Sequence, residues 1–434
     1  MTPPKLAAFL YVLGILLMPF AMTSMLRSLH LFHPTLVLGA LVFLLLGAPM
    51  RDKRALTVVV YAFLSASVGY FFIAVSQDRE NPSSLYTVYI EPIRLCLYVI
   101  WFWVSIEFLR TKRSFVFRWL AISAALQLGI AIYLYLALYN LVPVPDVVAV
   151  YLSLFKMRQS VWIGDTPVPR MAGTFAEGPP FGLFMFSCFV IFAIFLTERR
   201  KIGMPGCLEM KWAIFGGTVT LVGAVASLSD QIFLAVIVFG LFLYHRLNEN
   251  STERTRARRF AEVALATLLL VGMAVYVLPN VVTKATQAAD TKAGELDTRA
   301  DAGRERMFHI RYGLGLLGEN PLAIFTGIGP GRYGDYVVRT GQYRADVPTQ
   351  IMPIAWLVEY GALGTLLIVN WLWNITNRAQ QKHSSLAIGG CAALVLANIT
   401  QGFWMSDAWF LALAFFYCAG SEKTPKLATP SRTL

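Results

Sequence analysis

Residues 180–197, PFGLFMFSCFVIFAIFLT, form an apolar stretch that contains no charged side chain. A helix needs ~20 mostly apolar residues to cross the hydrocarbon core of a bilayer. The basic run TERRK at 197–201 follows at once, which is typical of the cytoplasmic end of a membrane span. Residues 180–197 therefore predict a transmembrane helix, and the rest of the chain repeats this pattern.

Apolar blocks of this kind recur along the whole chain, of which 57% is hydrophobic and only 14% charged. Soluble domains carry roughly 25% charged residues, so a water-soluble protein is excluded. Only helices and closed barrels satisfy every backbone polar group in lipid, and continuous apolar runs lack the alternation of barrel strands. We therefore predict an all-α polytopic membrane protein. About 12 transmembrane helices are expected, near 5–25, 31–49, 55–75, 90–109, 119–142, 180–197, 212–229, 231–245, 260–282, 351–374, 386–400 and 402–420.

Lysine and arginine set the orientation, because the cytoplasmic connectors of membrane proteins are enriched in both. The connectors after even-numbered spans are basic, and together with the two tails they hold 22 of the 37 Lys and Arg residues. Both termini are therefore predicted to be cytoplasmic. Most of the net charge of +12 sets topology in this way, and no nucleic-acid-binding motif accompanies it. We expect no nucleic-acid partner.

Two long connectors on the opposite, outer side also carry positive charge, namely 143–179 and 283–350. The larger one divides the chain into residues 1–282 with nine predicted spans, the loop 283–350, and residues 351–434 with three spans and the cytoplasmic tail. Long loops escape the positive-inside bias, so the predicted topology stands. Their arginines instead suggest an anionic ligand on the outer side.

The larger outer loop contains a predicted helix over 301–317. Arg304 and Arg311 are seven residues apart and share one face of it, while Arg306 and His309 lie on a neighbouring strip. The glycine-rich turn FTGIGPGRYGDY at 325–336 follows. Guanidinium groups and bare backbone amides both donate well to phosphate oxygens, so this combination favours a phosphate ligand. Glycines also serve tight turns that bind nothing, which is the alternative reading.

The shorter outer segment ends in RMAGTFAEGPPFG at 170–182. Its carboxylate, Glu177, lies just before a predicted span, where poor solvation suits a general base. Glu177 can equally form an interfacial salt bridge with Arg170, since structural ion pairs occur at such sites too. The two prolines at 179 and 180 are expected to open the helix that follows.

Ionisable residues inside predicted spans are functional candidates by default. Glu91 and Arg94 are three residues apart and are predicted to pair on one helical face, while Glu359 and Asp407 lie within later spans. For each of them, pairing within the helix bundle explains the charge as well as catalysis does. The histidines show no metal-ligand spacing, so no metal site is expected.

Three motifs in this order resemble the bacterial O-antigen ligase and polymerase superfamily. They are RMAGTFAEGPPFG (170–182), RERMFHIRYGLGLLGENPLAIFTGIGPGRYGDY (304–336) and TQIMPIAWLVEYGALG (349–364). The resemblance covers about residues 165–365 and implies a GT-C-like glycosyltransferase of the bacterial inner membrane with a periplasmic loop. It also implies undecaprenyl-pyrophosphate-linked glycans as donor and acceptor, and neither a cofactor, a metal nor a nucleotide sugar. A chain-length regulator is a further candidate partner.

The resemblance assigns roles to the charged residues singled out above. Glu177 is the expected base, with His309 as second candidate and loop packing as its alternative role. The expected ligands of the pyrophosphate are Arg170, Arg304, Arg306, Arg311, Arg94 and Arg332. Ligases typically carry a histidine where the loop returns to the membrane; this chain has Gln350 there, which cannot act as a base. A polymerase is therefore expected, with a ligase and a lipid-linked-glycan transporter as alternatives.

Overall fold

The computed structural model describes residues 2–19, 32–50, 52–75, 85–138, 141–143, 145, 160–163, 166–169, 175, 178–202, 207–227, 229–249, 298–319, 321–339, 352–383, 385–398 and 406–419. Within these ranges the fold is helical apart from one two-stranded hairpin. Six of the described helices are long and apolar enough to cross a membrane. The prediction of a helical fold is thereby confirmed, and the length and composition of these six helices support a membrane protein.

Each predicted span inside the described ranges coincides with a helix. These helices are α1 (Pro3–Leu17), α3 (Pro34–Leu46), α4 (Lys53–Val75), α5 (Leu85–Thr111), α6 (Arg113–Leu138), α8 (Gly178–Ile202), α9 (Cys207–Ala226), α10 (Asp230–Glu249), α15 (Met352–His383), α16 (Ser385–Asn398) and α17 (Asp407–Ala419). The ninth predicted span, 260–282, lies outside the described residues. The helix predicted over 301–317 is present within α12 (Thr298–Glu319), followed by α13 (Pro321–Thr326) and α14 (Tyr333–Arg339).

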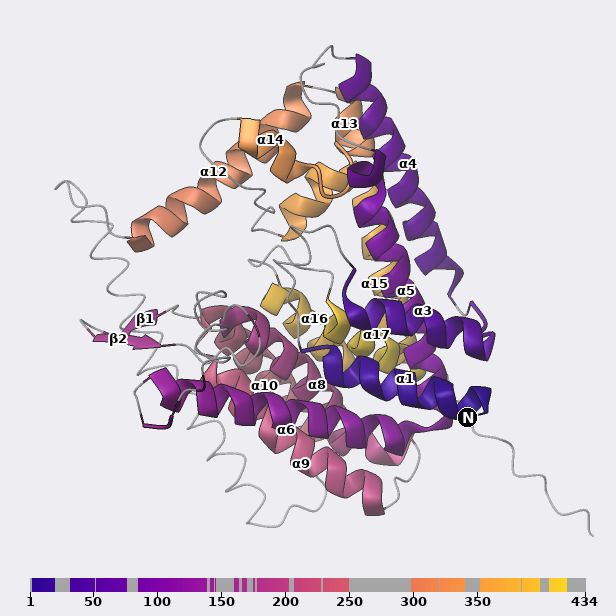
Figure 1. The fold of residues 1–434 in the computed structure, drawn as a ribbon, viewed down its shortest axis with the longest axis vertical. Coiled ribbons are helices and arrows are strands. Elements are labelled where there is room, and N and C mark those ends of the chain that lie inside the picture. Colours follow the sequence, from indigo (N-terminus) through magenta and orange to yellow (C-terminus); the bar gives the residue numbers. More distant parts are fainter. Residues whose placement is uncertain are drawn as a thin grey trace, which may run out of the picture.

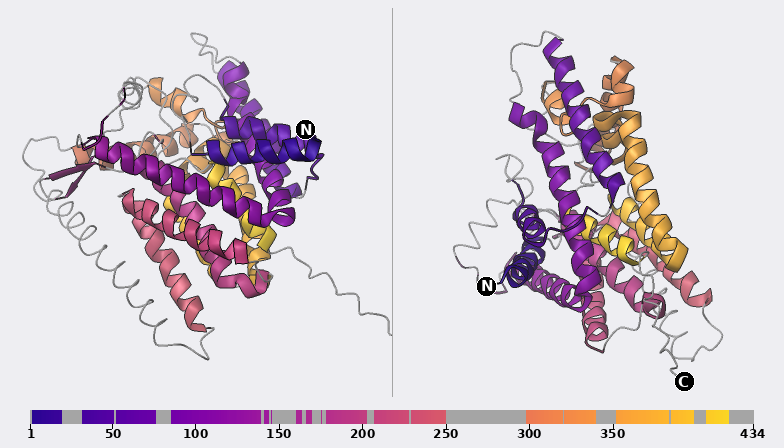
Figure 2. Two further views of the ribbon diagram at one scale, coloured as in Figure 1. Left: turned by 60° about the horizontal axis from the view of Figure 1, so that its bottom comes forward. Right: turned by 90° about the vertical axis from the view of Figure 1, so that its right-hand side faces the viewer.

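The helices form two groups (Figure 1). In one group, α6 and α8 pack on α9, and α10 packs on α16. In the other group, α4, α5 and α15 lie side by side, with α12, α13 and α14 at their far end (Figures 1 and 2). Helix α17 joins the two groups, because it packs on α5, α8 and α15.

Trp101 of α5 is the point where the N-terminal helices meet the rest of the fold. Its ring is fully buried and stacks on Tyr11 of α1 with a centroid distance of 5.0 Å. Glycines face it from both α1 and α3: a Cβ on Gly14 or Gly39 would lie 3.2 or 3.0 Å from the indole. Small residues let membrane helices approach closely in this way. The indole N–H donates to the carbonyl oxygen of Asp407, 3.2 Å away, which ties α5 to α17.

Several helix boundaries follow from local chemistry. Helix α8 begins at Gly178, so the two prolines fall in its first turn as predicted. Asp52 precedes α4 and accepts the backbone N–H of Arg54 at 3.0 Å, as helix N-caps do. The same carboxylate accepts the indole N–H of Trp371 at 3.2 Å and so fastens the start of α4 to α15.

Two of the predicted intramembrane acids have ionic partners. Glu91 pairs with Arg94 on α5, which confirms the predicted helical pair. Asp407 was expected inside the last span but is the first residue of α17, where the helix dipole favours a negative charge. Its carboxylate lies 2.7 Å from Nδ1 of His33, the residue before α3, and both side chains are buried. The pair links the start of α3 to the start of α17.

Two features were not predicted from the sequence. An antiparallel hairpin, β1 (Ser160–Ile163) and β2 (Thr166–Pro169), pairs Val161 with Val168 and ends directly before residue 170. Helix α15 is broken at Gly361, whose φ of 67° and ψ of −177° are not helical. The break divides α15 into a short first part before Gly361 and a long second part after it.

Candidate functional site

The glycine-rich turn between α13 and α14 lies directly against the break in α15. Gly327, Gly329 and Gly331 have positive φ angles of 76°, 102° and 73°. A Cβ on Gly327 would lie 2.2 Å from the carbonyl oxygen of Glu359, and a Cβ on Gly361 would lie 2.4 Å from the backbone nitrogen of Gly327. Two backbone segments can approach this closely only where neither carries a side chain. The glycines therefore serve the contact between turn and helix.

The turn supplies the hydrogen bonds that the broken helix lacks. In an uninterrupted helix the carbonyls of residues 358–360 would accept from amides four residues later. Here the N–H of Ile328 donates to the carbonyl of Val358 at 2.9 Å, and the N–H of Gly329 donates to that of Glu359 at 3.1 Å. Unpaired backbone groups are costly in a membrane, so these bonds stabilise the break.

Helix α4 provides the hydroxyl groups that complete this arrangement. The hydroxyl of Tyr61 lies within hydrogen-bonding distance of the carbonyls of Tyr360, 3.1 Å, and Phe325, 2.9 Å. One turn further on, the Ser65 hydroxyl faces the carbonyls of Thr326 at 2.6 Å and Glu359 at 3.2 Å. We call the unit formed by residues 325–333, residues 358–361 and this face of α4 the turn–break junction.

Four charged residues gather at the turn–break junction. Arg332 is only 2% exposed, and its aliphatic stem lies 3.1 Å from the Cβ position of Gly329. Glu91, which pairs with Arg94, packs against Gly331, and Glu91 and Glu359 both interact electrostatically with the Tyr360 phenol. Arg94 is already held by Glu91, so an anion that bound Arg94 would have to displace this partner.

His309 holds α12 on α14. Its ring is fully buried, and Nδ1 lies 2.9 Å from the hydroxyl of Tyr333, which in turn donates to the carbonyl of His309 at 3.1 Å. Phe308 and Tyr312 flank this pair in a small apolar core. The placement matches the packing role that was the alternative reading of His309.

The outer arginines on α12 are only partly described. Arg304, Arg306 and Arg311 all lie on this helix, as predicted, and Arg311 is exposed. The side chains of Arg304 and Arg306 are outside the described set, as are Arg170 and Glu177 altogether. That these groups meet at one place stays a prediction.

Described residues flank the segment that carries Arg170 and Glu177. The β1–β2 hairpin ends at Pro169, directly before Arg170, and α8 begins at Gly178, directly after Glu177. Between them, Phe175 is 5% exposed and packs against Phe181 and Phe184 of α8, with centroid distances of 6.1 and 5.7 Å. Phe175, the aromatic residue of the Gly-Thr-Phe motif, thus packs on the first turns of α8.

Sequence reasoning missed the contribution of α4. Tyr61, Ser65 and Gly69 follow one another at intervals of four residues and so lie on one face of the helix. A Cβ on Gly69 would lie 2.3 Å from the carbonyl oxygen of Ile328. A stripe of hydroxyl and small residues within a lipid-facing helix is the signal that could have predicted this contact.

The described part of the chain is a helical membrane protein whose distinctive element is the turn–break junction, and it holds no group of three His, Cys, Asp or Glu residues placed to bind a metal ion. No family model and no curated protein matches the chain.

Proposed function

We propose that the chain is a membrane glycosyltransferase that polymerises undecaprenyl-pyrophosphate-linked oligosaccharide repeat units on the periplasmic face of the bacterial inner membrane. The proposal includes 12 spans, cytoplasmic termini and a periplasmic loop at 283–350. The observation that carries it is the junction between the second and third motifs of the resemblance. Their Gly-x-Gly and Glu-x-Gly segments, about 30 residues apart, are joined backbone to backbone through Ile328 and Gly329. Contact between the two segments supports the proposal, because motifs that belong to one site are expected to lie close together.

In the proposed reaction, a hydroxyl of the acceptor sugar attacks the anomeric carbon of the donor glycan. A new C–O bond forms while the bond from the anomeric carbon to the pyrophosphate oxygen breaks, with inversion. Glu177 takes the hydroxyl proton, and undecaprenyl pyrophosphate leaves with the bonding electrons. Arg170, Arg304 and Arg311, aided by Arg306, stabilise the negative charge that develops on the leaving group, an effect that is strong in a site shielded from water.

The structure supports an outer anion site on α12 in one further respect. Helix α12 is fixed by the His309–Tyr333 contact and by packing on α15, while Arg311 on the same helix is exposed. An exposed guanidinium on a firmly held helix can bind a phosphate without first losing a buried partner. The exposed position of Arg311 lets a substrate reach the guanidinium directly.

A lipid-linked-glycan transporter is the second candidate, because transporters often have broken helices in the membrane. The break at Gly361 is such a feature. In transporters the freed backbone groups bind the transported ion or substrate. Here the carbonyls of Val358, Glu359 and Tyr360 are hydrogen-bonded to α4 and to the glycine-rich turn, which favours a structural break over a transport site.

The proposal is tested in a deletion strain of the source bacterium that is complemented with single variants. We expect Arg311→Ala to abolish long chains and to leave lipid-linked single repeat units, whereas the matched control Arg54→Ala keeps full polymer. Arg54 is an equally exposed arginine at the start of α4, on the predicted cytoplasmic side. Membrane levels of each variant are measured by immunoblot.

Three outcomes contradict the proposal, two of them the polymerase activity and one the role of the arginines. Long chains on undecaprenyl pyrophosphate together with undecorated lipid A–core in the deletion strain identify a ligase. Repeat units confined to the cytoplasmic leaflet identify a transporter. Full-length polymer in the Arg311→Ala strain shows that Arg311 is not needed for the reaction, which contradicts the proposed role of the arginines on α12.

A further inference from the structure

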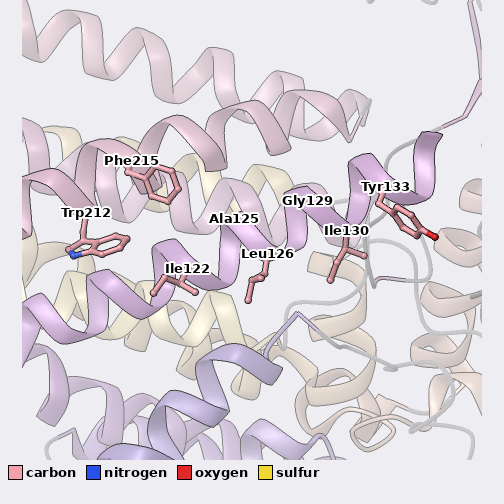
Figure 3. Close-up of a pocket in the computed structure, with 8 residues that line it drawn as sticks. All are labelled: Ile122, Ala125, Leu126, Gly129, Ile130, Tyr133, Trp212 and Phe215. Atoms are coloured by element: carbon pink, nitrogen blue, oxygen red, sulfur yellow. The ribbon is translucent and has the colours of Figure 1, made fainter. Parts of the chain in front are cut away.

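An apolar groove runs along α6 (Figure 3). Helix α6 belongs to the other group of helices than α4, α13 and α15, which form the turn–break junction (Figure 1). Its volume is about 580 Å³. The residues of α6 that line it recur at helical spacing and are Ile122, Ala125, Leu126, Gly129, Ile130 and Tyr133. Trp212 and Phe215 of α9 form its other wall, as Figure 3 shows. At ~1.5 Å per residue, the stripe from 122 to 133 is roughly 17 Å long, which is the length of an extended lipid chain segment rather than of a sugar or a peptide side chain.

Small residues make the floor of the groove. A Cβ added to Gly129 would meet no atom within 4 Å, so the space above this glycine is open. Leu126 and Phe215 are 54% and 45% exposed on either side of it. Since α6 and α9 are both candidate membrane spans, an apolar surface between them is suited to contact with lipid chains.

One end of the groove is cationic. Arg118 lies one helical turn before Ile122 on the same stripe of α6, and its guanidinium carbon is 5.7 Å from the ring centroid of Trp212. It also lies 5.8 Å from the ring of Trp119, so two indoles hold the guanidinium at this end. Tryptophan and arginine together are typical of the level of the lipid headgroups.

The two ends of the groove differ in charge. Nearby, Arg113 contacts Glu209 at 3.6 Å, which joins α6 to α9 and offsets the charge of that arginine. At the far end, the Tyr133 hydroxyl donates to the carbonyl of Pro143 at 2.8 Å and carries no charge. A ligand that fits both ends has a negative headgroup at Arg118 and an apolar chain that reaches toward Tyr133.

We infer that this groove binds an anionic phospholipid, with its phosphate at Arg118 and one acyl chain along Ala125 and Gly129. The proposed orientation of the chain places Arg118 at the cytoplasmic leaflet, where anionic lipids interact with basic residues between membrane helices. The lipid is distinct from the proposed substrate, whose pyrophosphate ligands lie on the outer segments. The inference therefore holds or fails independently of glycosyl transfer.

Native mass spectrometry of the purified full chain in detergent tests the site. The probes are phosphatidylglycerol and phosphatidylcholine with identical acyl chains. We expect phosphatidylglycerol to bind with preference, and Arg118→Ala to weaken it about fivefold, the factor expected for one basic residue at the headgroup level. Gly129→Leu fills the open space and should prevent binding of the chain. The matched controls are Arg54→Ala and Gly318→Leu, the latter at a helical glycine that also has open space above it.

Equal binding of both lipids, or unchanged binding in Arg118→Ala, overturns the headgroup assignment. Unchanged binding in Gly129→Leu overturns the location. Displacement of bound phosphatidylglycerol by undecaprenyl phosphate at equal concentration shows that the groove holds a polyprenyl chain, which also overturns the inference. Arg118→Lys keeps the charge and the fold, so intermediate binding by this variant distinguishes loss of charge from loss of structure.

Discussion

Replacing Gly361 by alanine should strongly disrupt the turn–break junction. Its backbone angles, φ 67° and ψ −177°, lie in a region that is essentially restricted to glycine, and an alanine there costs about 1–3 kcal/mol. The added methyl would also lie 2.4 Å from the Gly327 nitrogen and 2.4 Å from the Phe325 oxygen. Both are backbone atoms, which cannot rotate away, so overpacking adds about 1–3 kcal/mol. The expected loss of stability is therefore about 2–6 kcal/mol.

Two other glycines separate these contributions. Gly47 has a positive φ of 56° but open space around it, so Gly47→Ala should cost only the backbone strain, about 1–2 kcal/mol. Gly315 is helical with open space, and Gly315→Ala should be neutral or stabilise by about 0.5–1 kcal/mol. Thermal melting of the detergent-solubilised protein, followed by size-exclusion chromatography, should rank Gly361→Ala as least stable and Gly47→Ala as intermediate. Equal melting of the Gly361 and Gly47 variants would refute the close backbone approach.

Three further predictions concern topology, the anion site and a buried pair. In whole cells, an impermeant maleimide should label a cysteine introduced at Ala289 but not one at Asn250, and the reverse pattern contradicts the proposed orientation. Lysine at Arg170, Arg304 or Arg311 should restore only part of the polymer that is lost with alanine. The ammonium group of lysine is a point charge and lacks the bidentate hydrogen bonding of a guanidinium group. Full polymer in all three alanine variants rules out a pyrophosphate clamp. Asp407→Ala should destabilise the protein by about 1.5–3 kcal/mol, as loss of a hydrogen bond to a charged group does. In a double-mutant cycle with His33→Ala the two losses should be less than additive, and strict additivity would show that the 2.7 Å contact carries no energy.

A separate test addresses Glu177. If it is the base, Glu177→Gln should slow chain growth by roughly 10²–10⁴-fold while the carboxamide keeps the size of the side chain. If Glu177 only pairs with Arg170, the glutamine variant should be nearly silent, and the double variant should behave like Arg170→Ala. Loss of activity in His309→Ala with a silent Glu177→Gln would transfer the role to His309.

The positions of the membrane helices could be predicted because each depends mainly on its own residues. A span such as 180–197 is apolar enough to be recognised alone, and its start at Gly178 follows from two prolines. The Glu91–Arg94 pair was predictable for the same reason, since both partners lie on one helix.

The turn–break junction could not be predicted in this way, because its partners are far apart in the chain. Gly361 occurs in an apolar stretch that is compatible with a continuous helix. Only the presence of Ile328, Gly329 and Tyr61 makes the break favourable. The His33–Asp407 contact belongs to the same class, since local sequence gives no sign that residues 374 positions apart will meet.

The hydroxyl groups of α4 also have a consequence for biosynthesis. Tyr61 and Ser65 find their partners at Phe325 and Thr326, which are 264 and 261 residues further along the chain. At translation rates of about 5–20 residues per second, those partners emerge roughly 13 to 53 seconds after α4 itself. During that interval neither α13 nor α15 can cover the polar stripe of α4, and the Ser65 hydroxyl can bond back to a carbonyl of its own helix. The nascent chain therefore presents on α4 a temporary polar surface that an insertase or membrane chaperone can recognise, and arrival of α13 ends that exposure.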